Sequence, residues 1–137
     1  MIIGITGKKF SGKDTAAEVL ISEGYELVKF AGPLKAMVYA LMEYGGFTHD
    51  YSMRCIEGDL KELPLDIFGG KTTRYVMQTL GTEWGRTLIW DKLWTNFFDN
   101  KTKQYDKVVC TDLRFPNEFE LLEEKKAKTI RTERPDL

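Results

Sequence analysis

The residues whose types and spacing best suit chemistry form a glycine-bounded loop near the N-terminus, reading GKKFSGKDT from Gly7 to Thr15. Gly12 is followed directly by Lys13, which matches the phosphate-binding P-loop pattern GxxxxGK. Backbone N–H groups of such a loop can converge on an anion, and the unpaired N–H groups of a following helix add partial positive charge. The stretch therefore predicts binding of nucleotide phosphates, with Lys13 reaching the β and γ phosphates.

The position after the lysine departs from the usual pattern. Asp14 stands where Ser or Thr commonly holds magnesium, and Thr15 comes one place later. Either Asp14 approaches the metal through water, or Thr15 contacts the phosphates instead. A different interpretation is a glycine-rich turn that only caps a helix, a place for which an aspartate is well suited.

Two charged residues follow a short apolar run at 108–110 (VVC). In a parallel sheet the carboxyl end of such a strand lies beside the P-loop, at the edge where ligands bind. Asp112 could orient a magnesium-bound water there or accept a hydrogen bond from Thr15; the alternative is an ordinary aspartate at a helix entry. Arg114 is expected to face the same crevice, unless it forms a salt bridge with Glu118.

Other cations could grip phosphate groups, because the planar fork of arginine suits phosphate oxygens in pairs. Arg86, between two glycines and an aromatic stretch, is consistent with an acceptor-phosphate contact. Arg131 and Arg134 could close over the donor phosphates, or belong to a solvated charged tail. The remaining candidates are lysines: Lys8 and Lys9, which would add positive field in the loop, and Lys35, which spacing alone places on the surface.

Strand-like and helix-like patterns alternate along the chain and would position these residues. Short β-rich segments are expected at 2–5, 25–31, 108–110 and 127–132. Helical spacing of apolar residues is expected at 13–22, 34–44, 72–80 and 116–126. A further helical stretch is expected from about Trp84 to about Phe98. This alternation predicts an α/β fold with a central parallel sheet.

Two regions depart from that regularity. Residues 45–71 show no sustained period and are expected to be irregular, with one short helix, and able to move over a ligand. Gly81 and Gly85 are expected to interrupt the helix that begins near Thr72 or Thr73. The aromatic residues from Trp84 to Phe98 are expected in the core, with a dimer interface as the alternative.

Composition sets further bounds. The chain has 137 residues, 42% of them hydrophobic, with 20 basic and 21 acidic residues. The balanced charge argues against duplex nucleic acid as a partner. Cys55, Cys110 and the single His49 provide neither a zinc motif nor a disulfide framework, which suits a reducing, cytoplasmic setting. The opening apolar run is too short for a signal peptide, and no membrane span is expected.

With these pieces assembled, the chain resembles the phage-type deoxynucleoside monophosphate kinases. The GKDT sequence at 12–15 is typical of that family, whereas Gly32 stands where an acidic residue is more usual. The resemblance covers nearly the whole chain, and it is carried by GITGKKFSGKDT at 4–15, FAGPLK at 30–35, LGTEWGR at 80–86, TDLRFPNE at 111–118 and the segment 131–135.

The resemblance implies a three-layer fold of the P-loop NTPase and nucleoside monophosphate kinase type. It also implies transfer of the γ-phosphoryl group of ATP, with Mg²⁺, to deoxynucleoside monophosphates for DNA precursor synthesis. The residues implied to bind ATP phosphates are Gly7, Lys8, Ser11, Gly12, Lys13, Asp14 and Thr15. Those implied to bind the acceptor are Phe30, Lys35, Gln78, Trp84 and Arg86. The catalytic set is Lys13, Arg86, Asp112, Arg114 and Arg131, and the metal set, direct or through water, is Asp14, Thr15 and Asp112.

A single kinase domain is expected over 1–137, with 45–71 as an acceptor-side insertion and 131–137 as the start of a lid. Family members usually continue into a further strand and helix, so the fold is expected to be short at its C-terminus. The expected partners are the two nucleotides, with no direct nucleic acid or membrane contact and a homodimer as an option, in the cytoplasm, the host's if phage-encoded. The alternatives are another P-loop kinase, similar to dephospho-coenzyme A kinases, and a nucleotide- or protein-binding module without turnover.

Overall fold

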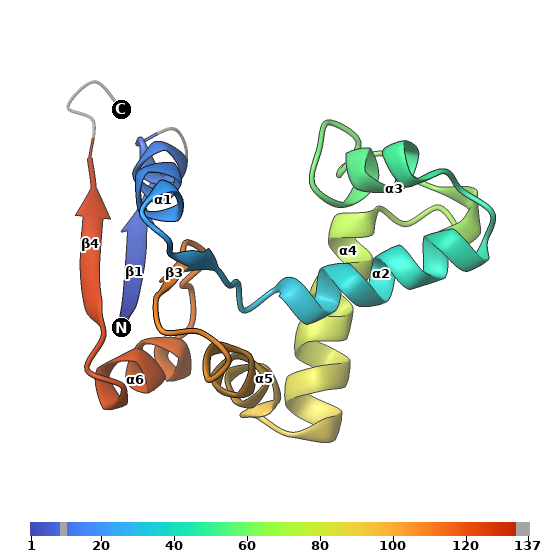
Figure 1. Ribbon diagram of the computed structural model, residues 1–137. Coiled ribbons are helices and arrows are strands. Elements are labelled where there is room, and N and C mark those ends of the chain that lie inside the picture. The colour runs from blue at the N-terminus through green and yellow to red at the C-terminus, as the bar shows by residue number, and fades with distance from the viewer. Residues whose placement is uncertain (9–10, 134–137) are drawn as a thin grey trace. The chain divides into compact units, whose positions relative to one another are not determined.

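The computed structural model describes residues 1–8 and 11–133 (Figure 1). They form an α/β structure with one parallel sheet in the order β2-β3-β1-β4. The strands are β1 (Ile2–Gly7), β2 (Glu26–Leu27), β3 (Val108–Cys110) and β4 (Lys128–Thr132). The α-helices are α1 (Lys13–Ser22), α2 (Gly32–Tyr44), α3 (His49–Ile56), α4 (Thr73–Thr79), α5 (Leu93–Thr102) and α6 (Pro116–Glu124). A 3₁₀ turn η1 (Asp66–Phe68) and a π-helix η2 (Leu80–Ile89) complete the set.

The chain divides into two compact units. Unit 1 contains residues 1–30 and the chain from Thr95 onward, and unit 2 contains Ala31–Trp94. The sheet, α1 and α6 belong to unit 1; helices α2, α3 and α4 belong to unit 2. The expectation of a single kinase domain with an acceptor-side insertion stays a prediction.

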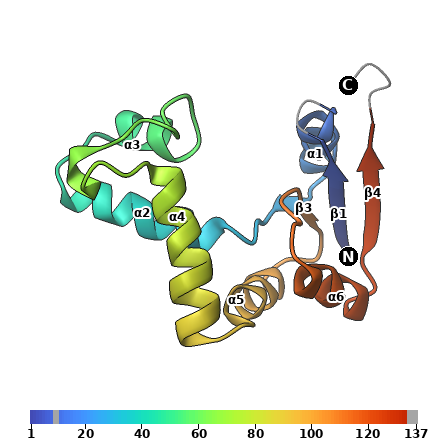
Figure 2. The same cartoon turned by 180° about the vertical axis from the view of Figure 1, so that it is seen from behind.

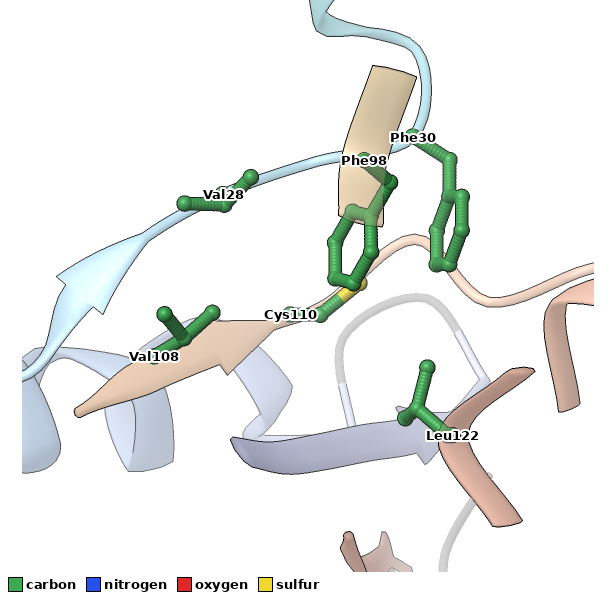
Figure 3. Close-up of a cluster of buried hydrophobic side chains, with 6 residues drawn as sticks. All are labelled: Val28, Phe30, Phe98, Val108, Cys110 and Leu122. Atoms are coloured by element: carbon green, nitrogen blue, oxygen red, sulfur yellow. The ribbon is translucent and has the colours of Figure 1, made fainter. Parts of the chain in front are cut away.

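Unit 1 has three layers, as predicted, because side chains of a strand alternate between its two faces. On one face, Val109 packs with Ile3 and Ile5 of β1 and with Ala17 of α1. On the other face, Val108 and Cys110 pack with Phe98 of α5 and Leu122 of α6, together with Val28 and Phe30. Figure 3 shows these six side chains. The rings of Phe30 and Phe98 are stacked, with 3.9 Å between their centroids.

Unit 2 is built around a second buried cluster. Val38 and Met42 of α2 pack against Cys55 and Ile56 of α3, and Leu65 closes the group. Figure 2 shows α2 and α4 crossing, with α3 beside them. Within 45–71 the chain forms α3 and η1 and is otherwise irregular.

Three expectations about individual elements need correction. The strand expected at 25–31 pairs only over Glu26–Leu27. The glycines expected to interrupt a helix instead lie buried in π-helix η2, which continues from α4. Of the aromatic stretch expected in the core, Trp94 and Phe98 are buried, but Trp84, Trp90 and Phe97 are 39%, 49% and 51% exposed.

Helix geometry explains the differences at the aromatic residues and at the two glycines. Trp94 and Phe98 are four residues apart on α5 and therefore share a face, whereas Phe97 is turned about 100° from Phe98 around the helix axis. In η2, the N–H of Trp90 donates to the carbonyl of Gly85 at 2.9 Å, the wide i to i+5 spacing of a π-helix. The indole N–H of Trp94 donates to the carbonyl of Gly81 at 2.9 Å. Gly85 thus lets Trp94 approach the helix closely, because a Cβ there would meet the indole ring.

Candidate functional site

The glycine-bounded loop lies between the end of β1 and the start of α1, as its sequence predicts. Gly12 adopts a left-handed conformation (φ 95°), which glycine reaches without steric cost, and α1 begins at the next residue. The carbonyl of Gly12 accepts the Ala16 N–H at 2.9 Å, the first bond of the helix. Lys13 is thereby fixed at a helix N-terminus, where unpaired N–H groups favour an anion. Lys9, also considered for this loop, lies outside the described residues.

A side chain of β4 holds this loop from the far end of the sequence. Ser11 is buried, and its Oγ lies 2.6 Å from Oγ1 of Thr132, the last residue of β4. Thr132 is in register with Gly7 at the end of β1. A Cβ on Gly7 would lie 2.7 Å from the carbonyl oxygen of Thr132 and would also meet both hydroxyl oxygens. Gly7 is therefore required by close packing as well as by its positive φ of 151°.

Asp112 lies at the same edge of the sheet. The end of β3 at Cys110 is in register with Gly4 of β1, and Asp112 follows two residues later. Its Oδ1 accepts the backbone N–H of Phe30 at 2.9 Å and lies 3.3 Å from the Cys110 sulfur. Burial, and then the charge of Asp112, raise the pKa of the Cys110 thiol above its ordinary value. Asp112 therefore anchors the segment after β2, a role that its sequence position did not indicate.

Arg114 and Glu118 interact in a way that differs from a side-chain salt bridge. Glu118 is 2% exposed, and its Oε1 accepts the backbone N–H groups of Arg114 at 2.8 Å and Phe115 at 3.1 Å. This carboxylate caps the start of α6, where a negative charge is stabilised by the helix dipole. The side chain of Arg114 is exposed at the carboxyl end of β3.

Of the basic residues expected in the lid, Arg131 lies in β4, next to the last residue of the strand. Arg131 forms an ion pair with Glu133, with 3.2 Å between Nε and Oε1 and both side chains 72% exposed. An ion pair so exposed contributes little to stability, which leaves the guanidinium available for another anion. Arg134 lies outside the described residues.

The acceptor-binding candidates are divided between the units. Phe30, in unit 1, is buried by its stack on Phe98. In unit 2, Lys35 pairs with Glu57 at 3.0 Å, and Arg86 donates from Nη1 to the carbonyl of Gly81 at 3.1 Å. Gln78 on α4 and Trp84 on η2 are exposed.

The metal candidates Asp14 and Thr15 are exposed on the first turn of α1 and offer oxygen ligands, the type that Mg²⁺ prefers. Over residues 1–8 and 11–133, no three His, Cys, Asp or Glu side chains gather as a metal site. The helices in this described part of the chain are all too short or too polar to cross a membrane.

Comparison with known proteins identifies the family. No family model matches the chain. A protein of Acanthamoeba polyphaga mimivirus, named "Putative deoxynucleotide monophosphate kinase", is 30% identical over 151 residues, covering 100% of this chain and 76% of that protein. The chain belongs to the deoxynucleotide monophosphate kinase family.

Two further similarities cover a smaller share of each chain than the mimivirus match does. The deoxynucleoside-5'-monophosphate kinase of Escherichia phage T5 is 42% identical over 53 residues, which is 37% of this kinase-family chain and 21% of the phage protein. Among solved structures, TT1252 from Thermus thermophilus matches with a TM-score of 0.48 and 22% identity, over 98% of this chain and 66% of that one.

Proposed function

We propose that this protein transfers the γ-phosphoryl group of ATP to a deoxynucleoside 5'-monophosphate and so supplies diphosphates for DNA synthesis. The observation that carries the proposal is the similarity, over 100% of this chain and 76% of the relative, to the mimivirus protein named "Putative deoxynucleotide monophosphate kinase". It is supported by the P-loop sequence standing between a buried parallel strand and a helix N-terminus.

In this proposal the loop binds the donor. The ammonium of Lys13 and the N–H groups at the start of α1 neutralise charge on the β and γ phosphates. Lys8 adds positive field, and Gly7 and Gly12 allow the backbone to approach the phosphates. Mg²⁺, held mainly by the donor phosphates and by Asp14 or Thr15, would supply further charge neutralisation.

The acceptor phosphate needs orientation more than activation. Its second proton is lost near pH 6, so an oxygen of the acceptor attacks the γ phosphorus directly while the bond to the bridging oxygen of ADP breaks. No general base is required, which suits a chain with one histidine. We assign acceptor contacts to Arg86, Trp84, Gln78 and Lys35, on the family resemblance.

Three residues are assigned to the reacting groups. Asp112 is proposed to orient the metal or its water. Arg114 is proposed to face the phosphates from the end of β3, and Arg131 to approach the donor from the end of β4. A cytoplasmic location suits the two free thiols, Cys55 and Cys110.

The test is product analysis. Purified protein is mixed with ATP, Mg²⁺ and each deoxynucleoside monophosphate in turn, and the nucleotides are separated by chromatography. The Lys13→Ala variant should lose about 100-fold or more in kcat/KM, as expected when a preorganised phosphate contact is removed. Lys128→Ala, an exposed lysine elsewhere in unit 1, is the matched control and should retain wild-type turnover.

Each outcome decides between functions. A diphosphate from at least one acceptor, lost in Lys13→Ala and retained in Lys128→Ala, supports the kinase. No product from any acceptor, with MgATP still raising the melting temperature, contradicts the kinase and favours a binding module. Phosphorylation of dephospho-coenzyme A in preference to every nucleotide points to another small-molecule kinase.

A further inference from the structure

The hydroxyl of Thr132 occupies an unusual place, because it joins the end of β4 to the phosphate-binding loop. It lies within hydrogen-bond distance of Ser11 Oγ, at 2.6 Å, and of the carbonyl oxygen of Thr6, at 3.2 Å. Strand β4 runs beside β1 (Figure 1). Thr132, the last residue of β4, is in register with Gly7. The end of β1, at Thr6 and Gly7, and the loop residue Ser11 therefore meet at the side chain of Thr132.

The hydrogen-bond directions follow from counting protons. A threonine hydroxyl carries one proton, and the carbonyl of Thr6 can only accept, so Thr132 donates to Thr6. The proton between the two hydroxyls must then come from Ser11, which donates to Thr132. The backbone N–H of Ser11 is also engaged, since it donates to the carbonyl of Lys8 at 3.0 Å. Both donors of Ser11 are thus used inside the protein.

We propose that Thr132 is a positioning residue, which with Ser11 forms a strut that fixes the loop in its phosphate-binding shape. Ser11 then acts by holding the loop and does not donate to a phosphate. Gly7 is part of the same arrangement, because any Cβ there would take the space of both hydroxyls. The proposal rests on the proposed function for its effect on nucleotide binding, but its effect on the loop is independent of that function.

The first test replaces the hydroxyl by a methyl group of similar shape. In Thr132→Val the amide of Ser11 should exchange with solvent several-fold faster. Affinity for MgATP, measured by calorimetry, should fall by roughly threefold to tenfold, the range that one hydrogen bond supplies. Thr132→Ser keeps the hydroxyl and should restore both quantities. The matched control is Thr129→Val on the same strand. Because Thr129 is exposed, this substitution should change neither the exchange rate of the Ser11 amide nor the affinity for MgATP.

A mutant cycle with Ser11→Ala separates positioning from direct contact. If Ser11 acts through Thr132, the double variant Ser11→Ala with Thr132→Val should bind MgATP no more weakly than the weaker single variant. A further severalfold loss when Ser11→Ala is added to Thr132→Val would show a direct phosphate contact and overturn the proposal.

Solvent exchange of the Ser11 amide distinguishes failure of the strut from failure of the proposed kinase function. Wild-type exchange at Ser11 in Thr132→Val, or no recovery in Thr132→Ser, would overturn the strut whether or not the protein binds nucleotide. Faster exchange in a protein that binds no MgATP at all would support the strut and contradict the proposed function.

Discussion

Gly85 in π-helix η2 offers a sharp test of the packing, because alanine there should act against its usual preference. Replacing a helical glycine by alanine ordinarily stabilises a helix by about 1 kcal/mol. At Gly85 the new Cβ would lie 2.5 Å from Cζ2 of Trp94 and 2.8 Å from its Nε1. The ring of Trp94 is 4% exposed and rigid, so it must move.

The magnitude follows from what that movement disturbs. Overpacking of a core costs about 1–3 kcal/mol. Weakening of the hydrogen bond from the Trp94 indole to the Gly81 carbonyl costs about 1 kcal/mol more, which offsets the gain in helix propensity. We therefore expect Gly85→Ala to lower the free energy of unfolding by about 1–3 kcal/mol. Because Arg86 donates to the same carbonyl, the KM for the acceptor should rise as well.

The assay is urea unfolding of wild type and variant, with the midpoint and slope fitted separately. Gly32→Ala is the matched control, since it lies in the same unit at the start of α2 with no atom within 4 Å of the added Cβ. It should leave the midpoint unchanged or slightly raised. A Gly85→Ala protein as stable as Gly32→Ala would refute the close packing described for Trp94.

Three further predictions concern the loop, an ion pair of unit 1 and the two thiols. Gly7→Ala should abolish MgATP binding and lower the melting temperature, measured by calorimetry, because the loop cannot pass the end of β4 with a Cβ in place. The Lys125 ammonium holds the pKa of the Asp99 carboxyl below its usual range, so this pair stabilises the fold above the ordinary aspartate pKa of about 3.9 and loses that effect as pH falls. Asp99→Asn should therefore cost about 0.5–1 kcal/mol at pH 7 in urea unfolding, and the difference should shrink below about pH 3.9. Burial raises the pKa of both Cys55 and Cys110, so neither thiol should react with Ellman's reagent at pH 8 until the protein is unfolded.

Local chemistry made the first part of the fold predictable from sequence. The apolar, β-branched run at 2–5 suits a buried strand and forms part of β1. The glycine at position 12 suits the turn into α1, where it adopts a left-handed conformation. Thr72 caps α4 through the N–H of Tyr75, at 3.0 Å, as its residue type suggests.

Contacts between distant residues explain what the sequence did not reveal. The strand expected at 25–31 is paired only over Glu26–Leu27, and further on the N–H of Phe30 donates to Asp112, far along the chain, instead of to a strand. Gly81 and Gly85 resemble helix breaks in the sequence, since nothing local indicates that Trp94 packs against Gly85 and donates to the carbonyl of Gly81. The strut from Thr132 to Ser11 spans 121 positions, so only the hydroxyl at a strand's carboxyl end could have hinted at it.

The most direct measurement follows the γ-phosphate itself. ATP labelled at the γ phosphorus is incubated with Mg²⁺, the protein and the best deoxynucleoside monophosphate, and the label is located after separation. We predict that it appears in the β-phosphate of the deoxynucleoside diphosphate, in equal amount to the ADP formed. Label that remains in ATP, or that is released only as inorganic phosphate, would contradict phosphoryl transfer to a nucleotide.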